Sequence, residues 1–209
     1  MENRKINNTH QLKFIHIGKC GGSSITKDLM DNDIVFKRTH GRAVKYDHRK
    51  KYFILLRNPV DRFASAFYWR KHTVLNWKSQ KDRFDGEYNF FQKYETIEDV
   101  IQADFSLFQK QYIHHIKEDI DFYIGDFVNQ CDPNNIIGIA CTETLNTDIK
   151  NIFNIESTNH KKNNKKRKIK IKKDTRVILK KYLYKDYLVV EKLNNLKLLT
   201  KEQYKILSK

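Results

Sequence analysis

The chain contains few of the residues that end secondary structure or cross-link a fold. Its 209 residues include seven glycines, two prolines and three cysteines. Cys20, Cys131 and Cys141 are odd in number and form no Cys-x-x-Cys pair. This argues against a disulfide framework and a structural zinc site, and it suits a reducing compartment. Three of the seven glycines lie between residues 18 and 22, so glycine is concentrated in one short loop.

Long hydrophobic runs are also absent. No run of about 18 apolar residues occurs, and polar residues lead from Met1 into a strand-like segment. We therefore expect no membrane span, no signal peptide and a cytoplasmic protein. Hydrophobic residues nevertheless make up 39% of the chain, with 13 Phe and 11 Tyr, which is enough to form a core. Residues 1–209 are expected to form a single domain.

Positive charge dominates the chain, with a formal net charge of +16. Residues 161–173 contribute nine basic residues and no acid, and the remainder, with 32 basic and 25 acidic residues, carries +7. Such an excess predicts an anionic partner: nucleotide phosphates, nucleic acid, an acidic glycan or a membrane surface. We expect a flexible, lysine-rich segment at about residues 159–174. The alternative is a clamp over a nucleotide or an anionic acceptor.

Strand patterns alternate with helical patterns along the chain. Strands are expected at residues 12–17, 34–37, 51–56 and 136–141, and helices from residue 59 onward and at 96–101, 105–116, 146–153, 175–193 and 201–207. Residues 73–94 show little periodicity and are expected to run over the surface. Val177, Ile178, Leu183 and Leu188 are expected core contacts. The alternation predicts an α/β fold with a mostly parallel sheet covered on both faces.

The first candidate site is the glycine-rich turn that follows residues 12–17, Gly18-Lys19-Cys20-Gly21-Gly22-Ser23-Ser24. A turn of this kind exposes backbone N–H groups, and the next helix adds a positive dipole end, so a phosphate would suit it. A nucleotide triphosphatase loop would need Gly at position 13 and Ser or Thr at position 20. Lys13 and Cys20 stand there instead. The turn therefore lacks that motif and the hydroxyl that would hold Mg²⁺.

The second candidate site follows the strand at 51–56, in the sequence Arg57-Asn58-Pro59-Val60-Asp61-Arg62-Phe63-Ala64-Ser65. Asn58 is a suitable helix N-cap, and Pro59 is tolerated at the first helical position. Val60, Phe63, Ala64 and Phe67 form the apolar stripe of a core-facing helix. Arg57 could fork onto a phosphate, and the Ser65 hydroxyl could bind the same anion.

Together and in this order, the two motifs resemble those of sulfotransferases that use 3′-phosphoadenosine 5′-phosphosulfate (PAPS), in particular the carbohydrate sulfotransferase branch. That family has Phe-Ile-His-x-x-Lys-x-Gly-Gly-[Ser/Thr]-[Ser/Thr] for the 5′-phosphosulfate and Leu-Arg-[Asp/Asn]-Pro-x-x-Arg-x-x-Ser for the 3′-phosphate. Weaker similarity continues through Glu143 and residues 183–187, so the resemblance covers about residues 12–190. It implies a P-loop-like, three-layer fold and sulfuryl transfer to an acceptor hydroxyl, with a carbohydrate favoured and no metal.

The resemblance also implies a role for each matched position. Lys19 would neutralise the bridging oxygen of the leaving phosphosulfate, and Arg57 and Ser65 would bind the 3′-phosphate. His40 resembles the histidine that related carbohydrate sulfotransferases place between the motifs, and an imidazole suits a general base. Gly18 stands where the family often has proline, and Cys20 where it often has threonine. The positions implied to bind the 5′ end are Lys19, Cys20, Gly21, Gly22, Ser23 and Ser24.

Several alternatives stay open at this point. A nucleotide-dependent kinase or phosphotransferase, a basic nucleic-acid-binding protein without a recognisable motif, and a sulfotransferase that binds without turnover are each compatible with part of the sequence. Arg62 is expected to be structural, paired with Asp61 or Glu143. His16 is expected to pack against the sheet. His114 and His115 fall in a helical pattern without ligand partners at metal-binding spacing, so we expect them to be packed or solvated.

Overall fold

The computed structural model describes residues 11–156 and 171–209. The predicted lysine-rich segment at about residues 159–174 therefore lies outside the described residues, apart from its last four positions. None of the described helices is long and apolar enough to cross a membrane.

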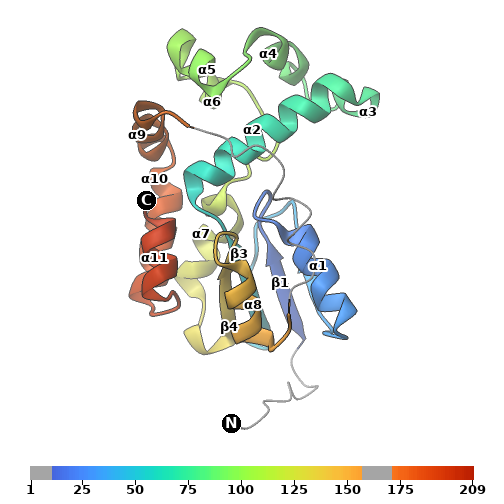
Figure 1. Cartoon of the computed structure of the whole chain (residues 1–209), viewed down its shortest axis with the longest axis vertical. Coiled ribbons are helices and arrows are strands. Elements are labelled where there is room, and N and C mark those ends of the chain that lie inside the picture. The colour runs from blue at the N-terminus through green and yellow to red at the C-terminus, as the bar shows by residue number, and fades with distance from the viewer. Residues whose placement is uncertain (1–10, 157–170) are drawn as a thin grey trace.

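Four parallel strands form the central sheet (Figure 1). Their spatial order is β2 (Lys37–Thr39), β1 (Leu12–His16), β3 (Lys51–Leu56) and β4 (Ile136–Cys141). Each neighbouring pair is parallel. In β3, every residue after Lys51 is buried, as expected for a parallel strand covered on both faces. The prediction of an α/β fold with a parallel sheet is confirmed.

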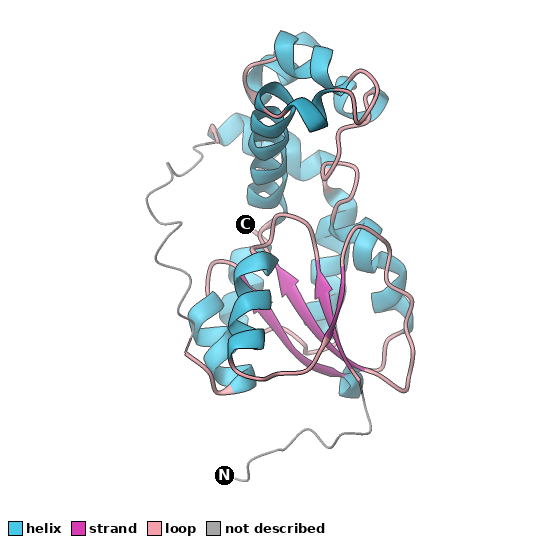
Figure 2. Cartoon of the chain, turned by 90° about the vertical axis from the view of Figure 1, so that its right-hand side faces the viewer, coloured by secondary structure: helices cyan, strands magenta, loops and turns pink. Residues whose placement is uncertain are grey.

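Helices cover both faces of this sheet (Figure 2). Tyr52 and Phe53 point to opposite faces because side chains alternate along a strand. Tyr52 packs against Phe127 of α7 (Ile120–Gln130) with ring centroids 4.8 Å apart. Phe53 packs against Phe153 of α8 (Leu145–Phe153) at 4.9 Å. The sheet is therefore the middle of three layers.

Three more helices complete the core around the sheet. The first, α1 (Gly22–Asp31), follows β1 and buries Ile25 and Leu29. Near the C-terminus, α10 (Tyr184–Asn195) and α11 (Lys201–Leu207) bury Leu193 and Leu207 in the same cluster. A short 3₁₀ turn, Pro133–Asn135, leads into β4.

A second apolar core surrounds α2 (Pro59–Asn76), which runs away from the sheet toward a group of shorter helices (Figure 1). Asn58 caps α2, since its Oδ1 accepts hydrogen bonds from the N–H groups of Val60 at 3.1 Å and Asp61 at 3.2 Å. The predicted stripe from Val60 to Phe67 is buried. The shorter helices are α3 (Lys78–Lys81), α4 (Glu87–Lys93), α5 (Ile97–Asp104), α6 (Leu107–Lys110) and α9 (Lys173–Tyr182).

Two stretches before β4 differ from the sequence predictions. Residues 73–94, expected to run over the surface, contain α3 and α4, and Phe90 and Phe91 are buried because the aromatic rings pack in the second core. The helix expected at 105–116 ends at Lys110. His115 adopts a φ of +64°, which is outside the right-handed helical region, so turns replace the helix there. The sequence analysis also did not predict α7.

Two further predictions were displaced. The strand expected at 34–37 forms at Lys37–Thr39, and Val35 is exposed. The helix expected at 175–193 is divided at Leu183 into α9 and α10. Leu183 is buried as expected. Val177 and Leu188 were also expected in the core, but they are 49% and 61% exposed, because the break interrupts the apolar stripe.

Arg62 on α2 is fully buried and connects three segments. Its Nη1 donates to the carbonyl oxygens of Gly18 at 3.4 Å, His115 at 2.9 Å and Glu118 at 3.2 Å. The structural role expected for Arg62 is confirmed, but its expected partners are wrong. Asp61 pairs with Arg176, and Glu143 lies beside Arg57, because both carboxylates face the opposite side of the α2 N-terminus.

The buried carboxyl group of Asp186 and the half-buried one of Asp119 interact electrostatically with the Arg62 guanidinium. Burial raises the pKa of Asp186 to about 8 and also raises the pKa of Asp119, while the charge of Arg62 opposes both shifts. Asp186 Oδ1 accepts a hydrogen bond from the Asp121 N–H at 2.9 Å. Because one guanidinium compensates one carboxylate, we infer that this pair retains a proton near neutral pH.

The variant Asp186→Asn tests this proton. The folded pKa of about 8 lies above the ordinary 3.8, so the folded chain holds a proton that the unfolded chain releases. Stability of the wild type should therefore fall as the pH rises from about 4 to about 8, and it should fall less in the variant. Urea unfolding at pH 5 and pH 8 measures this. An equal pH dependence in both proteins would contradict the prediction.

Candidate functional site

The two sequence motifs meet where β1 and β3 end. From β1 the chain continues to β2 on one side of the sheet, and from β3 it continues to β4 on the other. In open parallel sheets, a crevice for ligands forms at the carboxyl ends of strands where the connections diverge in this way. The glycine-rich turn follows β1 and Arg57 follows β3, so both lie at that edge.

The turn after β1 has the backbone of an anion-binding loop. Lys19 has a φ of +71° and Gly21 a φ of +87°, so left-handed residues alternate with ordinary ones. Successive N–H groups in such an arrangement point into a common concavity. Gly21 is the N-cap residue of α1, and among the described residues no side chain caps this helix. Its first N–H groups and its positive dipole end therefore lie at the carboxyl end of β1.

Two glycines of the turn are required by close neighbours. A Cβ at Gly22 would lie 1.9 Å from Cδ2 of His16, and a Cβ at Gly18 would lie 2.7 Å from Nδ1 of His115. Both separations are too short for van der Waals contact. The His115 ring therefore leaves no room for a Cβ at Gly18 unless the ring moves.

Arg57 links the two motifs. Its Nη1 donates to the carbonyl oxygen of Lys19 at 3.3 Å, and its Nε lies 4.0 Å from Oε1 of Glu143. That Nε is buried and has no hydrogen-bond partner among the described residues. The Glu143 carboxylate also accepts a hydrogen bond from the Asn58 N–H at 3.3 Å. Arg57 thus has donor capacity left for an anion beside the loop.

Thr142, at the end of β4, joins the loop to the sheet. Its hydroxyl lies 2.8 Å from the carbonyl oxygen of Cys20 and 3.0 Å from that of Leu56. Sequence analysis did not find Thr142, because these contacts span 122 and 86 residues. The one feature of the sequence that could have indicated Thr142 is its position, as a small hydroxyl residue directly after a buried strand.

Trp69 on α2 is a second residue that the sequence analysis did not single out. The ammonium of Lys19 lies 4.3 Å from the centroid of the Trp69 ring, within the range of a cation–π interaction. The ring therefore lies against the ammonium and limits the positions that it can adopt beside the loop.

Ser65 lies on the same face of α2 as Arg62 and Trp69, because residues three and four apart share a helix face. Arg62 contacts the Gly18 carbonyl and Trp69 contacts Lys19, so this face is directed toward the loop. The structure thus brings Ser65 to the same side as the loop. No direct contact with Arg57 is observed among the described residues.

Cys20 contributes to the core rather than presenting its thiol to the crevice. The residue is fully buried, and burial raises the thiol pKa to about 12. Its N–H donates to the Ile17 carbonyl at 3.3 Å, and its own carbonyl accepts from Thr142. Cys20 therefore shapes the loop through its backbone. Ser23 is exposed and Ser24 is half-buried, so both hydroxyls are accessible at the start of α1.

His40 lies next to the loop at the end of β2. Its Nδ1 is 2.9 Å from the carbonyl oxygen of His16, and the two rings stack with centroids 4.4 Å apart. His16 is buried, as expected, and burial lowers its pKa to about 3. His40 itself is exposed. If Nδ1 carries the proton for this hydrogen bond, Nε2 can accept a proton from an acceptor.

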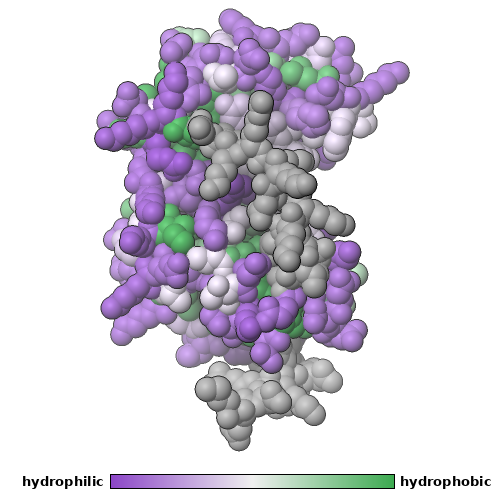
Figure 3. All heavy atoms as spheres, in the orientation of Figure 1, coloured by the Kyte–Doolittle hydropathy of each residue, from purple (hydrophilic) through white to green (hydrophobic). Residues whose placement is uncertain are grey.

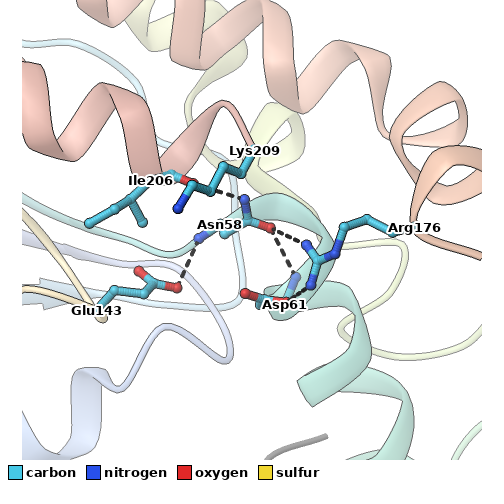
Figure 4. Close-up of a pocket in the computed structure, with 6 residues that line it drawn as sticks. All are labelled: Asn58, Asp61, Glu143, Arg176, Ile206 and Lys209. Atoms are coloured by element: carbon cyan, nitrogen blue, oxygen red, sulfur yellow. Dashed lines mark hydrogen bonds and ion pairs between the residues drawn. The ribbon is translucent and has the colours of Figure 1, made fainter. Parts of the chain in front are cut away.

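A cavity of about 470 Å³ lies at the N-terminus of α2 (Figure 4). Within it, Arg176 pairs with Asp61 at 2.6 Å and donates to Asn58 Oδ1 at 3.4 Å, and the Asn58 amide donates to the Ile206 carbonyl at 3.0 Å. Hydrophilic side chains cover most of the visible face of the molecule around these elements (Figure 3). The residues lining the cavity are Asn58, Asp61, Glu143, Arg176, Ile206 and Lys209.

No family model, curated protein or solved structure matches this chain. The resemblance to sulfotransferases therefore depends on the two motifs and on their placement at one edge of the sheet.

The variant Gly22→Ala tests the packing under the loop. The added methyl group would overlap the His16 ring, so the variant should lose about 1–3 kcal/mol of unfolding free energy despite the better helix propensity of alanine. In a His16→Ala background, most of this loss should disappear because the clashing ring is gone. Urea unfolding of the four proteins in this cycle measures the coupling. If the changes in unfolding free energy of the two single variants were additive in the double variant, there would be no steric overlap between residue 22 and His16.

Proposed function

We propose that this protein is a PAPS-dependent sulfotransferase that moves a sulfuryl group to an acceptor hydroxyl, with a carbohydrate as the favoured acceptor. The observation that carries the proposal is the contact between the two motifs. Arg57 and Lys19 are 38 residues apart, and yet Arg57 Nη1 reaches the Lys19 carbonyl at the carboxyl end of the sheet. One phosphorylated nucleotide could therefore contact both motifs.

The residues at this edge suit the two phosphate groups of such a donor. The N–H groups of the turn and of the uncapped α1 N-terminus fit the 5′-phosphate, with the Ser23 and Ser24 hydroxyls beside them. Arg57 has a buried Nε available for the 3′-phosphate, and Ser65 lies on the adjacent face of α2. When bound, PAPS would supply an activated sulfuryl group.

Charge stabilisation by Lys19 is the central catalytic contribution in this proposal. As the sulfuryl group leaves, negative charge develops on the bridging oxygen of the phosphosulfate, and an ammonium beside the loop stabilises it. The Trp69 ring lies against the Lys19 ammonium and so restricts it to a position beside the glycine-rich turn. Preorganisation of this kind lowers the barrier without the need for reorganisation during transfer.

His40 is the proposed general base. An acceptor hydroxyl must lose its proton as it attacks the sulfur, and an imidazole next to the loop can take that proton. The His16 carbonyl fixes the ring through Nδ1, which leaves Nε2 for the acceptor. Carbohydrate hydroxyl groups and other hydroxyl acceptors all require this proton transfer, so the base does not select among them.

Binding of 3′-phosphoadenosine 5′-phosphate, the product of the donor, tests the nucleotide site. Isothermal titration should show micromolar binding to the wild type and binding at least about tenfold weaker in Lys19→Ala and in Arg57→Ala, since each loses a charged contact. Lys27→Ala and Arg49→Ala, which change exposed residues, serve as matched controls and should bind like the wild type.

Absence of binding by the folded wild type would refute the proposal. Stronger competition by ATP with Mg²⁺ would favour a kinase or phosphotransferase. Binding of nucleic acid that weakens steeply with salt and persists in Lys19→Ala would favour the nucleic-acid alternative.

His40→Asn tests the base separately from donor binding. The variant should bind 3′-phosphoadenosine 5′-phosphate with wild-type affinity, because His40 is assigned to the acceptor side. Transfer from labelled PAPS to a panel of glycans should fall by about 10²-fold or more. Equal transfer rates in the two proteins would exclude His40 as the base. No transfer by the wild type to any acceptor, together with normal nucleotide binding, would favour a protein that binds without turnover.

A further inference from the structure

Two histidines and a glutamate converge in the turns between α6 and α7. Oε2 of Glu118 lies 3.3 Å from Nε2 of His114 and 3.5 Å from Nδ1 of His115. One ligand atom from each of the three residues lies within 4.8 Å of the other two. The sequence analysis dismissed the histidines because it placed them in a helix. In the observed turn that argument no longer applies, and Glu118 becomes their neighbour.

The separations fit metal ligands better than they fit hydrogen bonds. Ligand atoms arranged tetrahedrally at about 2.1 Å from a zinc ion are about 3.4 Å apart. The observed 3.3 Å and 3.5 Å agree with this spacing, whereas N–H···O hydrogen bonds are commonly 2.7–3.2 Å long. Nδ1 of His115 and Oε2 of Glu118 are buried and make no hydrogen bond among the described residues. A cation between them would satisfy both atoms.

The backbone of the turn is held in place by two buried arginines. Arg62 donates to the His115 carbonyl at 2.9 Å. The His114 N–H donates at 3.1 Å to Glu87, which forms a buried ion pair with Arg70. His115 is in the left-handed region, which is unfavourable for a residue with a Cβ and is common where structure serves a site. The two imidazoles are therefore positioned by the core.

We propose that His114, His115 and Glu118 bind a divalent transition-metal ion such as Zn²⁺. Two imidazoles and one carboxylate are a ligand set typical of this class, and three protein ligands leave at least one coordination position open. The site adjoins the glycine-rich turn, since a Cβ at Gly18 would lie 2.7 Å from Nδ1 of His115. The metal site shares none of the residues assigned to the nucleotide, so evidence against the proposed function would not count against the metal site.

Titration of the metal-stripped, full-length protein with Zn²⁺ tests the site, with calorimetry as the readout. The wild type should bind one ion at this site, and Glu118→Gln and His114→Ala should each weaken binding at least about tenfold by removing a ligand. His72→Ala, which removes an exposed histidine on α2, is the matched control and should bind like the wild type. Co²⁺ should give visible d–d absorption in the wild type and in the control, but not in Glu118→Gln.

Thermal unfolding separates a lost ligand from a damaged fold. Zn²⁺ should raise the Tm of the wild type by mass action and leave that of Glu118→Gln unchanged, while circular dichroism establishes that both proteins are folded. Absence of Zn²⁺ binding by the folded wild type would overturn the proposal. So would Zn²⁺ affinity that is the same in the wild type and in both ligand variants, since the ion would then bind elsewhere.

Discussion

The buried guanidinium of Arg62 is the constraint on which the arrangement of both candidate sites depends. It bonds to the carbonyl of Gly18, at the start of the glycine-rich turn, and to those of His115 and Glu118. Backbone carbonyls partly solvate a charge that would otherwise be costly to bury, and the carboxyl groups of Asp119 and Asp186 interact with it electrostatically. Because the glycine-rich turn and the turn at 111–119 share one donor group on α2, the guanidinium fixes their positions relative to each other.

A second buried arginine extends this arrangement into the helical part of the molecule. Arg70, two turns after Arg62 on α2, pairs with Glu87 of α4, and Glu87 also receives the His114 N–H. Helix spacing places Arg62, Ser65 and Trp69 on one face of α2, toward the loop, and Arg70 contacts Glu87 from a neighbouring face. A single helix therefore contacts the loop, the Lys19 ammonium and, through Glu87, the histidine turn.

The sequence predicted those parts of the fold that depend on local chemistry. Strands β3 and β4, the capped start of α2 and the glycine-rich turn each have a signal within a few residues: a buried-type run, Asn58-Pro59, and adjacent glycines. The turn at 111–119 has no such signal. Its conformation depends on Arg62, Arg70 and Glu87, which are 17 to 56 residues away from their partners. Trp69 and Thr142 were missed for the same reason, since each acts on the loop across a long sequence separation.

Charge balance at the edge of the sheet gives the strongest physical reason to expect an anionic ligand there. Arg57 has Glu143 at 4.0 Å and one buried N–H without a hydrogen bond among the described residues. The dipole end of α1 adds further positive potential. A phosphate would replace the long contact to Glu143 with shorter, charge-assisted hydrogen bonds. With the anion bound, Glu143 would keep its hydrogen bond to Asn58. Without an anion, Glu143 serves as the counter-charge of Arg57.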